Sequence, residues 1–128
     1  MKKKYLIVIA DYYKDISKGL LNSALSFIPK SDITKIISVP GVFEIPVTIS
    51  KNLKKYDGFI ALGCVIKGET PHFDFISHAS TNAIMKLSIE TKKPIGNGII
   101  TCLNMKQAKA RKKKGLEAAN AVLSVLSQ

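Results

Sequence analysis

Apolar runs alternate along this chain with segments in which apolar residues recur every three or four positions. Four segments are predicted to be strands: 5–10, 33–39, 59–66 and 94–101. The run 5–10 is apolar throughout, which is typical of a strand buried on both faces of a sheet. The periodic segments predict helices over 15–28, from a turn at 41–46 to about 53, over 75–91, over 104–111 and over 116–126. We expect Asn104 to cap the fourth helix and Gly115 to separate it from the fifth.

Strands and helices in this order predict one domain, residues 1–128, of the α/β class. Apolar strands joined by helices form parallel sheets with both faces covered, because right-handed crossovers place helices on each side. We therefore expect a three-layer α/β/α sandwich of the flavodoxin-like type around a four-stranded parallel sheet. Ligands of such sheets bind outside the carboxyl ends of the strands. The segments that follow positions 10, 39, 66 and 101 should therefore carry the chemistry.

The charge of the chain favours an anionic partner. Its 128 residues include 20 Lys and Arg against 9 Asp and Glu, for a net charge of +11, and only Arg111 is an arginine. Two interpretations remain open: a nucleic-acid surface, or a solvated lysine-rich surface with one local site for a small anion. Readers of nucleic-acid bases rely on arginine, so the second interpretation is favoured and no nucleic-acid partner is expected.

The cysteines and the N-terminal sequence favour a reducing compartment. Cys64 and Cys102 lie inside apolar runs, without a Cys-x-x-Cys pattern or a spaced cluster of Cys and His. We expect buried, reduced thiols and no metal site. Asp11 ends the first apolar run too early for a signal peptide, and no run approaches the ~20 residues of a membrane span. The expected location is the cytoplasm, with no membrane partner.

Two candidate groups follow the first and second predicted strands. Tyr12 and Tyr13 could stack on a planar ligand, or they could be ordinary half-exposed tyrosines. Glu44 lies just after a Pro-Gly turn at the start of a helix. Its carboxylate could accept hydrogen bonds from ligand hydroxyl and N–H groups, or it could simply favour the helix dipole.

The segment after the third strand combines groups for anion binding and for proton transfer. Gly68, Glu69 and Thr70 precede a helix, so backbone N–H groups and a hydroxyl could cradle an anion there. His72 is suited to proton transfer near neutral pH, and Asp74 could orient it. A surface histidine in a loop explains the local sequence equally well.

A basic stretch follows the fourth strand and includes Lys106, Lys109 and residues 111–114. A solvated helix face is the usual explanation for such a run. Arg111 is the exception, because its planar guanidinium can grip a phosphate with two parallel hydrogen bonds. The chain contains no P-loop, glycine-rich dinucleotide loop or nucleophile elbow, so we expect no nicotinamide, no nucleotide hydrolysis, no serine hydrolase chemistry and no cofactor.

Two motifs taken together resemble one enzyme family. Pro-Gly-Val-Phe-Glu-Ile-Pro at 40–46 and Ala-Leu-Gly-Cys-Val-Ile-Lys-Gly-Glu-Thr-Pro-His-Phe-Asp at 61–74 closely resemble the lumazine synthases, and the resemblance runs from Tyr5 through 114–119. It implies the penultimate step of riboflavin biosynthesis. In that step 5-amino-6-(D-ribitylamino)uracil condenses with 3,4-dihydroxy-2-butanone 4-phosphate, with loss of phosphate and water. The implied partners are two small molecules, one of them phosphorylated.

The resemblance also implies a role for individual residues. Those implied to bind the ribitylaminouracil stack on its ring, hold its ribityl chain or read the uracil through the backbone: Tyr12, Val42, Phe43, Glu44, Cys64, Val65 and Ile66. Those implied to bind the butanone phosphate are Glu69, Thr70, Arg111 and Lys114. His72 would move protons, with Asp74 as its partner.

Members of the family assemble as pentamers, paired pentamers or sixty-subunit shells with sites between subunits, so Arg111 would complete a neighbour's site. The chain departs from the family pattern at three places. Asn97 stands where Phe is frequent beside the ring pocket, Lys67 replaces a frequent Arg, and the connection at 111–115 is short. The alternative to an enzyme is a non-catalytic, basic flavodoxin-like module that binds RNA or a lumazine-type ligand.

Overall fold

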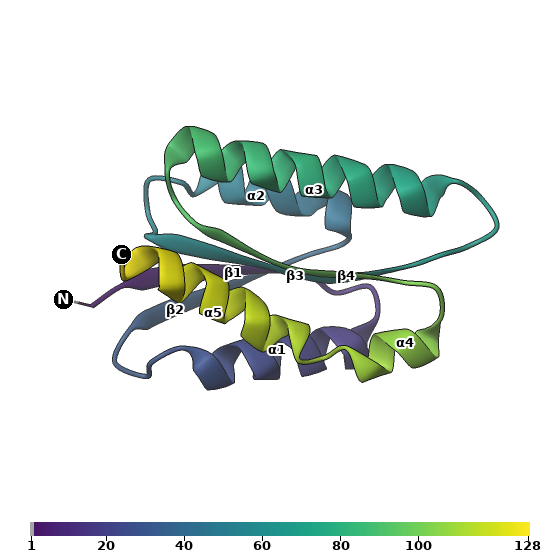
Figure 1. The fold of residues 1–128 in the computed structure, drawn as a ribbon, viewed down its shortest axis with the longest axis horizontal. Helices are drawn as coiled ribbons and strands as arrows, with labels where there is room; N and C mark the ends of the chain where they lie inside the picture. Colours follow the sequence, from purple (N-terminus) through teal and green to yellow (C-terminus); the bar gives the residue numbers. More distant parts are fainter. Residues whose placement is uncertain (1) are drawn as a thin grey trace.

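The computed structural model describes residues 2–128 and contains one parallel sheet in the order β2-β1-β3-β4 (Figure 1). Its strands are β1 (Lys4–Ala10), β2 (Ile33–Val39), β3 (Gly58–Ile66) and β4 (Ile95–Cys102). The helices are α1 (Lys14–Phe27), α2 (Ile45–Lys51) after a 3-10 turn η1 (Val42–Glu44), α3 (His72–Thr91), α4 (Met105–Ala110) and α5 (Lys114–Leu126). Helices α1, α4 and α5 cover one face, and α2 and α3 cover the other. The predicted three-layer α/β/α sandwich is confirmed.

The central strands β1 and β3 are buried on both faces. Along β1, Ile7 and Ile9 enter the apolar core beneath α1 and α5, whereas Leu6 and Val8 enter the core beneath α2 and α3. Burying one such side chain stabilises the fold by about 1.5–3 kcal/mol. Because alternate residues of a strand point to opposite faces, each residue of β1 from Tyr5 to Ala10 helps to attach one of the two helical layers.

Strand β2 departs from the predicted burial on both faces. Its bounds are those predicted, but Ile33 is 41% exposed and Ile36 is 46% exposed, and only Val39 is buried. The reason is position in the sheet, because β2 pairs with β1 alone and forms one edge. The polar residues Thr34, Lys35 and Ser38 within this strand fit its position at the edge.

The junction between α4 and α5 also corrects an expectation. The side chain of Asn104 accepts a hydrogen bond from the backbone N–H of Gln107 at 2.9 Å, so the predicted cap is confirmed. Gly115, however, does not separate the helices: residues 111–113 do, and Gly115 lies buried in the first turn of α5. In addition, α3 begins at His72 rather than at 75.

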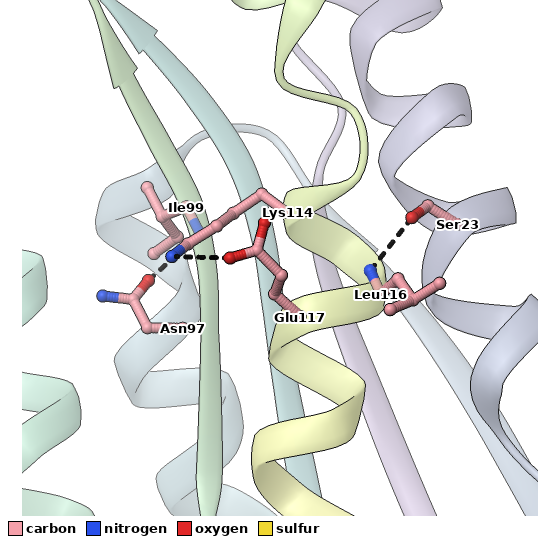
Figure 2. Close-up of polar contacts among 6 residues, drawn as sticks. All are labelled: Ser23, Asn97, Ile99, Lys114, Leu116 and Glu117. Atoms are coloured by element: carbon pink, nitrogen blue, oxygen red, sulfur yellow. Dashed lines mark hydrogen bonds and ion pairs between the residues drawn. The ribbon is translucent and has the colours of Figure 1, made fainter.

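Gly115 is a glycine because α5 rests directly on α1 at this point. A methyl group at position 115 would lie 2.1 Å from the carbonyl oxygen of Leu20. One residue further on, the backbone N–H of Leu116 donates to the hydroxyl of Ser23 at 3.0 Å (Figure 2). Helix α1 therefore satisfies a free N–H group at the start of α5. Among residues 2–128, no helix has both the length and the apolar character needed to cross a membrane.

We expect the substitution Gly115→Ala to lower the free energy of unfolding by about 1–3 kcal/mol, because the backbone of α1 must move to make room. Helix propensity alone would favour alanine by only about 1 kcal/mol, so the steric clash decides the sign. Urea denaturation followed by far-UV circular dichroism measures the change. Gly68→Ala is the matched control, since no atom lies within 4 Å of the added methyl group. Equal stability of the two variants would contradict this account of the α1–α5 contact.

Candidate active site

A cavity of about 340 Å³ opens at the carboxyl ends of the strands, where the fold predicts ligand binding. It is bordered by the end of β1, the turn after β2, the end of β3 and the first residues of α3. Its lining residues are Ala10, Tyr12, Tyr13, Gly41, Val42, Phe43, Glu44, Cys64, Val65, Ile66, His72 and Ile76. The structure thus brings together eight of the site residues that the family resemblance implies, and with them Tyr13, the second aromatic candidate after the first strand. None of the lining residues is a lysine or an arginine.

Tyr12 forms the most exposed aromatic surface of the cavity. Its side chain is 74% exposed, and its ring meets the ring of Tyr13 edge to face, with centroids 4.8 Å apart and planes at 83°. The start of α1 is fixed to β1 because the buried hydroxyl of Ser17 donates to the carbonyl of Ala10 at 2.9 Å. An exposed aromatic ring on a fixed backbone can stack on a planar ligand.

The turn after β2 places a carboxylate and a second aromatic ring at the cavity. The backbone N–H of Glu44 donates to the carbonyl of Gly41 at 3.1 Å, which closes the 3-10 turn. The carboxylate of Glu44 folds back over this turn, and a methyl group at position 41 would lie 3.1 Å from its Oε1 atom. Phe43 is half exposed, and its ring centroid lies 6.1 Å from that of His72.

Strand β3 is longer than β1 at this edge of the sheet. Its pairing with β1 ends at Leu62, whereas its pairing with β4 continues through Ile66. On the side away from β4, the backbone of 63–66 therefore has no strand partner, and three of these residues line the cavity. A strand edge presents N–H and C=O groups in a row. Such an edge can form hydrogen bonds with a planar ring that carries both donors and acceptors.

His72 is exposed at the first position of α3, and its ring lines the cavity. Its backbone N–H lies 3.4 Å from the hydroxyl of Thr70, which accepts the hydrogen bond. Glu69 and Thr70 are exposed just before the helix and are not among the cavity-lining residues. Within the described residues, no hydrogen bond or ion pair joins Asp74 to His72. The orienting role of Asp74 stays a prediction.

Three further residues singled out in the sequence lie elsewhere. Asn97, Arg111 and Lys114 border a second, more polar cavity of about 730 Å³ beside the β4 edge. The Nη1 group of Arg111 donates to the carbonyl of Thr101 at 3.2 Å. This chain alone does not bring Arg111 to the cavity that Tyr12 and His72 line.

Figure 2 shows two polar contacts among residues that line the second cavity, between Asn97 and Ile99 and between Lys114 and Glu117. The side-chain oxygen of Asn97 accepts from the backbone N–H of Ile99 at 3.0 Å, which leaves the amide NH₂ group free to donate. The Nζ atom of Lys114 lies 4.0 Å from Oε1 of Glu117, and both side chains are substantially exposed. An exposed ion pair of this kind contributes at most about 1 kcal/mol, so Lys114 can readily exchange its partner for another anion.

Comparison with known proteins agrees with these observations. The sequence model of 6,7-dimethyl-8-ribityllumazine synthase matches residues 2–128. A protein of this name from Bartonella henselae is 46% identical over 98% of this chain and 88% of its own length. Relatives of the same name from Bartonella bacilliformis and Agrobacterium fabrum are 48% and 41% identical, over 86% and 98% of this chain and 76% and 95% of theirs. The chain belongs to the 6,7-dimethyl-8-ribityllumazine synthase family.

In this lumazine synthase family member, four cavity-lining residues were not among the predicted site residues: Ala10, Tyr13, Gly41 and Ile76. Ala10, Gly41 and Ile76 line the cavity without a polar or reactive side-chain group, so their residue types gave no indication of a binding site. Tyr13 was a candidate for stacking beside Tyr12 at the strand end, but the family resemblance gave it no role. Within residues 2–128, no group of three or more His, Cys, Asp or Glu side chains is placed to hold a metal ion.

Cys64 contributes an apolar wall to the cavity in this family member. Both cysteines are free and buried, on neighbouring strands. Burial, together with a smaller contribution from the adjacent Cys102 thiol, raises the pKa of the Cys64 thiol to about 12. A thiol held neutral in this way is a poor nucleophile.

We expect Cys64 to resist a thiol reagent such as 5,5′-dithiobis(2-nitrobenzoic acid) at pH 8, where only about one thiol in ten thousand with this pKa is ionised. Labelling should become appreciable only as the pH approaches the raised pKa, and both cysteines should react at once in concentrated guanidinium chloride. Leu103→Cys supplies the matched control, because position 103 is exposed and should react quickly. Labelling of Cys64 in the folded protein as fast as that control would contradict its assignment as an inert wall.

Proposed function

We propose that this chain condenses 5-amino-6-(D-ribitylamino)uracil with 3,4-dihydroxy-2-butanone 4-phosphate to 6,7-dimethyl-8-ribityllumazine, phosphate and water, the penultimate step of riboflavin biosynthesis. The observation that carries the proposal is the cavity at the strand ends, which gathers Tyr12, Phe43, Glu44 and His72 beside an open strand edge. The names of the relatives support the same reaction. No comparison favours a non-catalytic RNA-binding module. The free buried cysteines support a cytoplasmic location.

The cavity suits the ribitylaminouracil in three respects. Tyr12 and Phe43 offer aromatic faces to the pyrimidine ring. The open edge of β3 at 64–66 offers backbone N–H and C=O groups to the uracil amide edges. Glu44 offers a carboxylate to the ribityl hydroxyl groups, each of which can donate a hydrogen bond. These contacts fix the substrate amine in one orientation.

The phosphate of the second substrate needs a positive partner, and none lines the cavity of the same chain. Glu69 and Thr70 lie directly before α3, whose free N-terminal N–H groups favour an anion. Arg111 and Lys114 lie at the other cavity. We infer a homo-oligomer, a pentamer with decamers or sixty-subunit shells as its larger forms, in which Arg111 and Lys114 of one subunit reach the phosphate bound at its neighbour.

The outer face of α3 supports assembly. Phe75, Met85 and Ile89 are large apolar side chains that remain exposed in the single chain. Their spacing of ten and four residues places them on one side of the helix, away from the sheet. A neighbouring subunit could remove this stripe from water. Asn97, at the second cavity, would then be presented to the ring bound by that neighbour.

The mechanism depends mainly on positioning. Holding the two substrates side by side makes their reaction effectively intramolecular, which can supply the largest share of the acceleration. The substrate amine attacks the ketone carbonyl, and loss of water gives an imine. His72 would then carry protons during dehydration and phosphate loss. Arg111, Thr70 and the start of α3 would stabilise the charge that develops on the departing phosphate.

We expect His72→Ala to lower kcat about a hundredfold, the low end for proton transfer, because positioning remains intact and the amine is already nucleophilic. Absorbance and fluorescence of the lumazine product follow the reaction for wild type and variant. His78→Ala is the matched control, since His78 is also exposed on α3 but does not line the cavity. An unchanged kcat at saturating substrate would remove His72 from proton transfer, and a wild type without product would refute the proposed reaction.

We expect Arg111→Ala to raise the KM of the butanone phosphate about ten- to a hundredfold, the value of a charge-assisted hydrogen bond. Lys106→Ala, which removes an exposed cation of α4, is the control. Coexpression of Arg111→Ala subunits with Glu44→Ala subunits tests whether Arg111 acts in the site of a neighbouring subunit. In a mixed oligomer, some sites would then combine the native Glu44 of one subunit with the native Arg111 of the next. Regained activity supports a shared site. Activity no higher than in either parent would place Arg111 in a site within its own subunit.

A further inference from the structure

The ring of Tyr12 is poorly held by the rest of the chain. It projects from the short segment between β1 and α1, and its side chain is 74% exposed. Within residues 2–128, its side chain makes no hydrogen bond or ion pair, and its one aromatic contact is the edge-to-face packing against Tyr13. An exposed side chain without a neighbour loses rotamer freedom when a ligand orders it, and that loss weakens binding. The contact with Tyr13 restricts Tyr12 before a ligand arrives.

Tyr13 is itself fixed on the protein. Its side chain is half buried and packs against the apolar core beneath α1 and α5, the core that contains Cys64. Its carbonyl accepts a hydrogen bond from the backbone N–H of Ser17 at 2.9 Å, which begins the ladder of α1. Burial raises the pKa of the Tyr13 hydroxyl, with smaller contributions from Cys64 and Tyr12, so the side chain stays neutral. Tyr13 is a rigid support at the edge of the cavity.

We propose that Tyr13 is a positioning residue that holds the ring of Tyr12 in the orientation that stacks on the pyrimidine substrate. This inference deepens the proposed function and rests on it. The edge-to-face geometry, 4.8 Å between centroids and 83° between planes, is a favourable arrangement for two aromatic rings. It leaves most of the Tyr12 surface accessible to a ligand. The ring of Tyr13, rather than its hydroxyl, performs this role.

The test compares Tyr13→Leu, Tyr13→Phe, Tyr12→Leu and the double variant Tyr12→Leu/Tyr13→Leu. Loss of the aromatic contact should raise the KM of the ribitylaminouracil about two- to tenfold in Tyr13→Leu. The kcat and the KM of the butanone phosphate should change by less than about twofold, which a general loss of structure would not produce. Tyr13→Phe should resemble wild type. Urea denaturation checks that each variant folds, and Tyr13→Met replaces Tyr13→Leu if the latter does not.

Titration with 6,7-dimethyl-8-ribityllumazine, followed by its fluorescence, provides a readout that needs no turnover. Its Kd should rise in Tyr13→Leu by the same factor as the KM of the uracil. In the Tyr12→Leu background, the further change to Tyr13→Leu should have no effect, because the supported ring is gone. The proposal would be overturned if Tyr13→Leu raised the Kd in the Tyr12→Leu background as much as it does in the wild type. It would also be overturned if Tyr13→Phe bound the lumazine as weakly as Tyr13→Leu. A wild type that binds the lumazine but forms none would refute the proposed reaction instead, with the binding comparison still decisive for Tyr13.

Discussion

The burial of β1 and β3 between two helical layers is the constraint on which the rest of this structure depends. Side chains of β1 enter the two apolar cores alternately, so neither layer can shift without exposing one set of them. This fixed pair of strands ends unevenly: β3 continues to Ile66, whereas its pairing with β1 ends at Leu62. The uneven end creates an open backbone edge, and the segments after β1 and β2 must pass beside it. The cavity is a consequence of strand length as much as of the side chains that line it.

Electrostatic attraction within the chain contributes little to this fold. A net charge of +11 produces self-repulsion, and the described residues contain two ion pairs, Lys86 with Glu90 and Lys114 with Glu117, both largely exposed. Exposed pairs of this kind contribute at most about 1 kcal/mol each. Apolar packing must therefore provide the stability. A surface rich in cations that lack carboxylate partners also raises the local concentration of small anions, which suits a phosphorylated substrate.

The sequence was most informative where local chemistry determines structure. Asn104 could be identified as a cap because a side-chain oxygen at that position satisfies a backbone N–H group whatever its surroundings. The exposure of Ile36 could not be inferred, because only the pairing of strands reveals that β2 is an edge. Gly115 looked like a helix breaker, but its reason is the carbonyl of Leu20 on another helix. In the site, residues at strand ends could be predicted from topology, whereas the separation of Arg111 from Tyr12 followed only from the family resemblance, because it depends on where the segment after α4 lies.

That separation is the structural reason for proposing that this domain functions as part of an assembly. The cavity at the strand ends offers aromatic surface, an open backbone edge, a carboxylate and an imidazole, which together suit a neutral, hydroxyl-rich ring compound. The cavity beside β4 offers a guanidinium and an ammonium group, which suit a phosphate. Placing cations inside the first cavity would pair them with Glu44 and occupy the acceptor proposed for the ribityl hydroxyl groups. Keeping the two sets of groups on different edges of one sheet avoids that neutralisation, and in the assembly proposed above contact between subunits would bring the ring and the phosphate together.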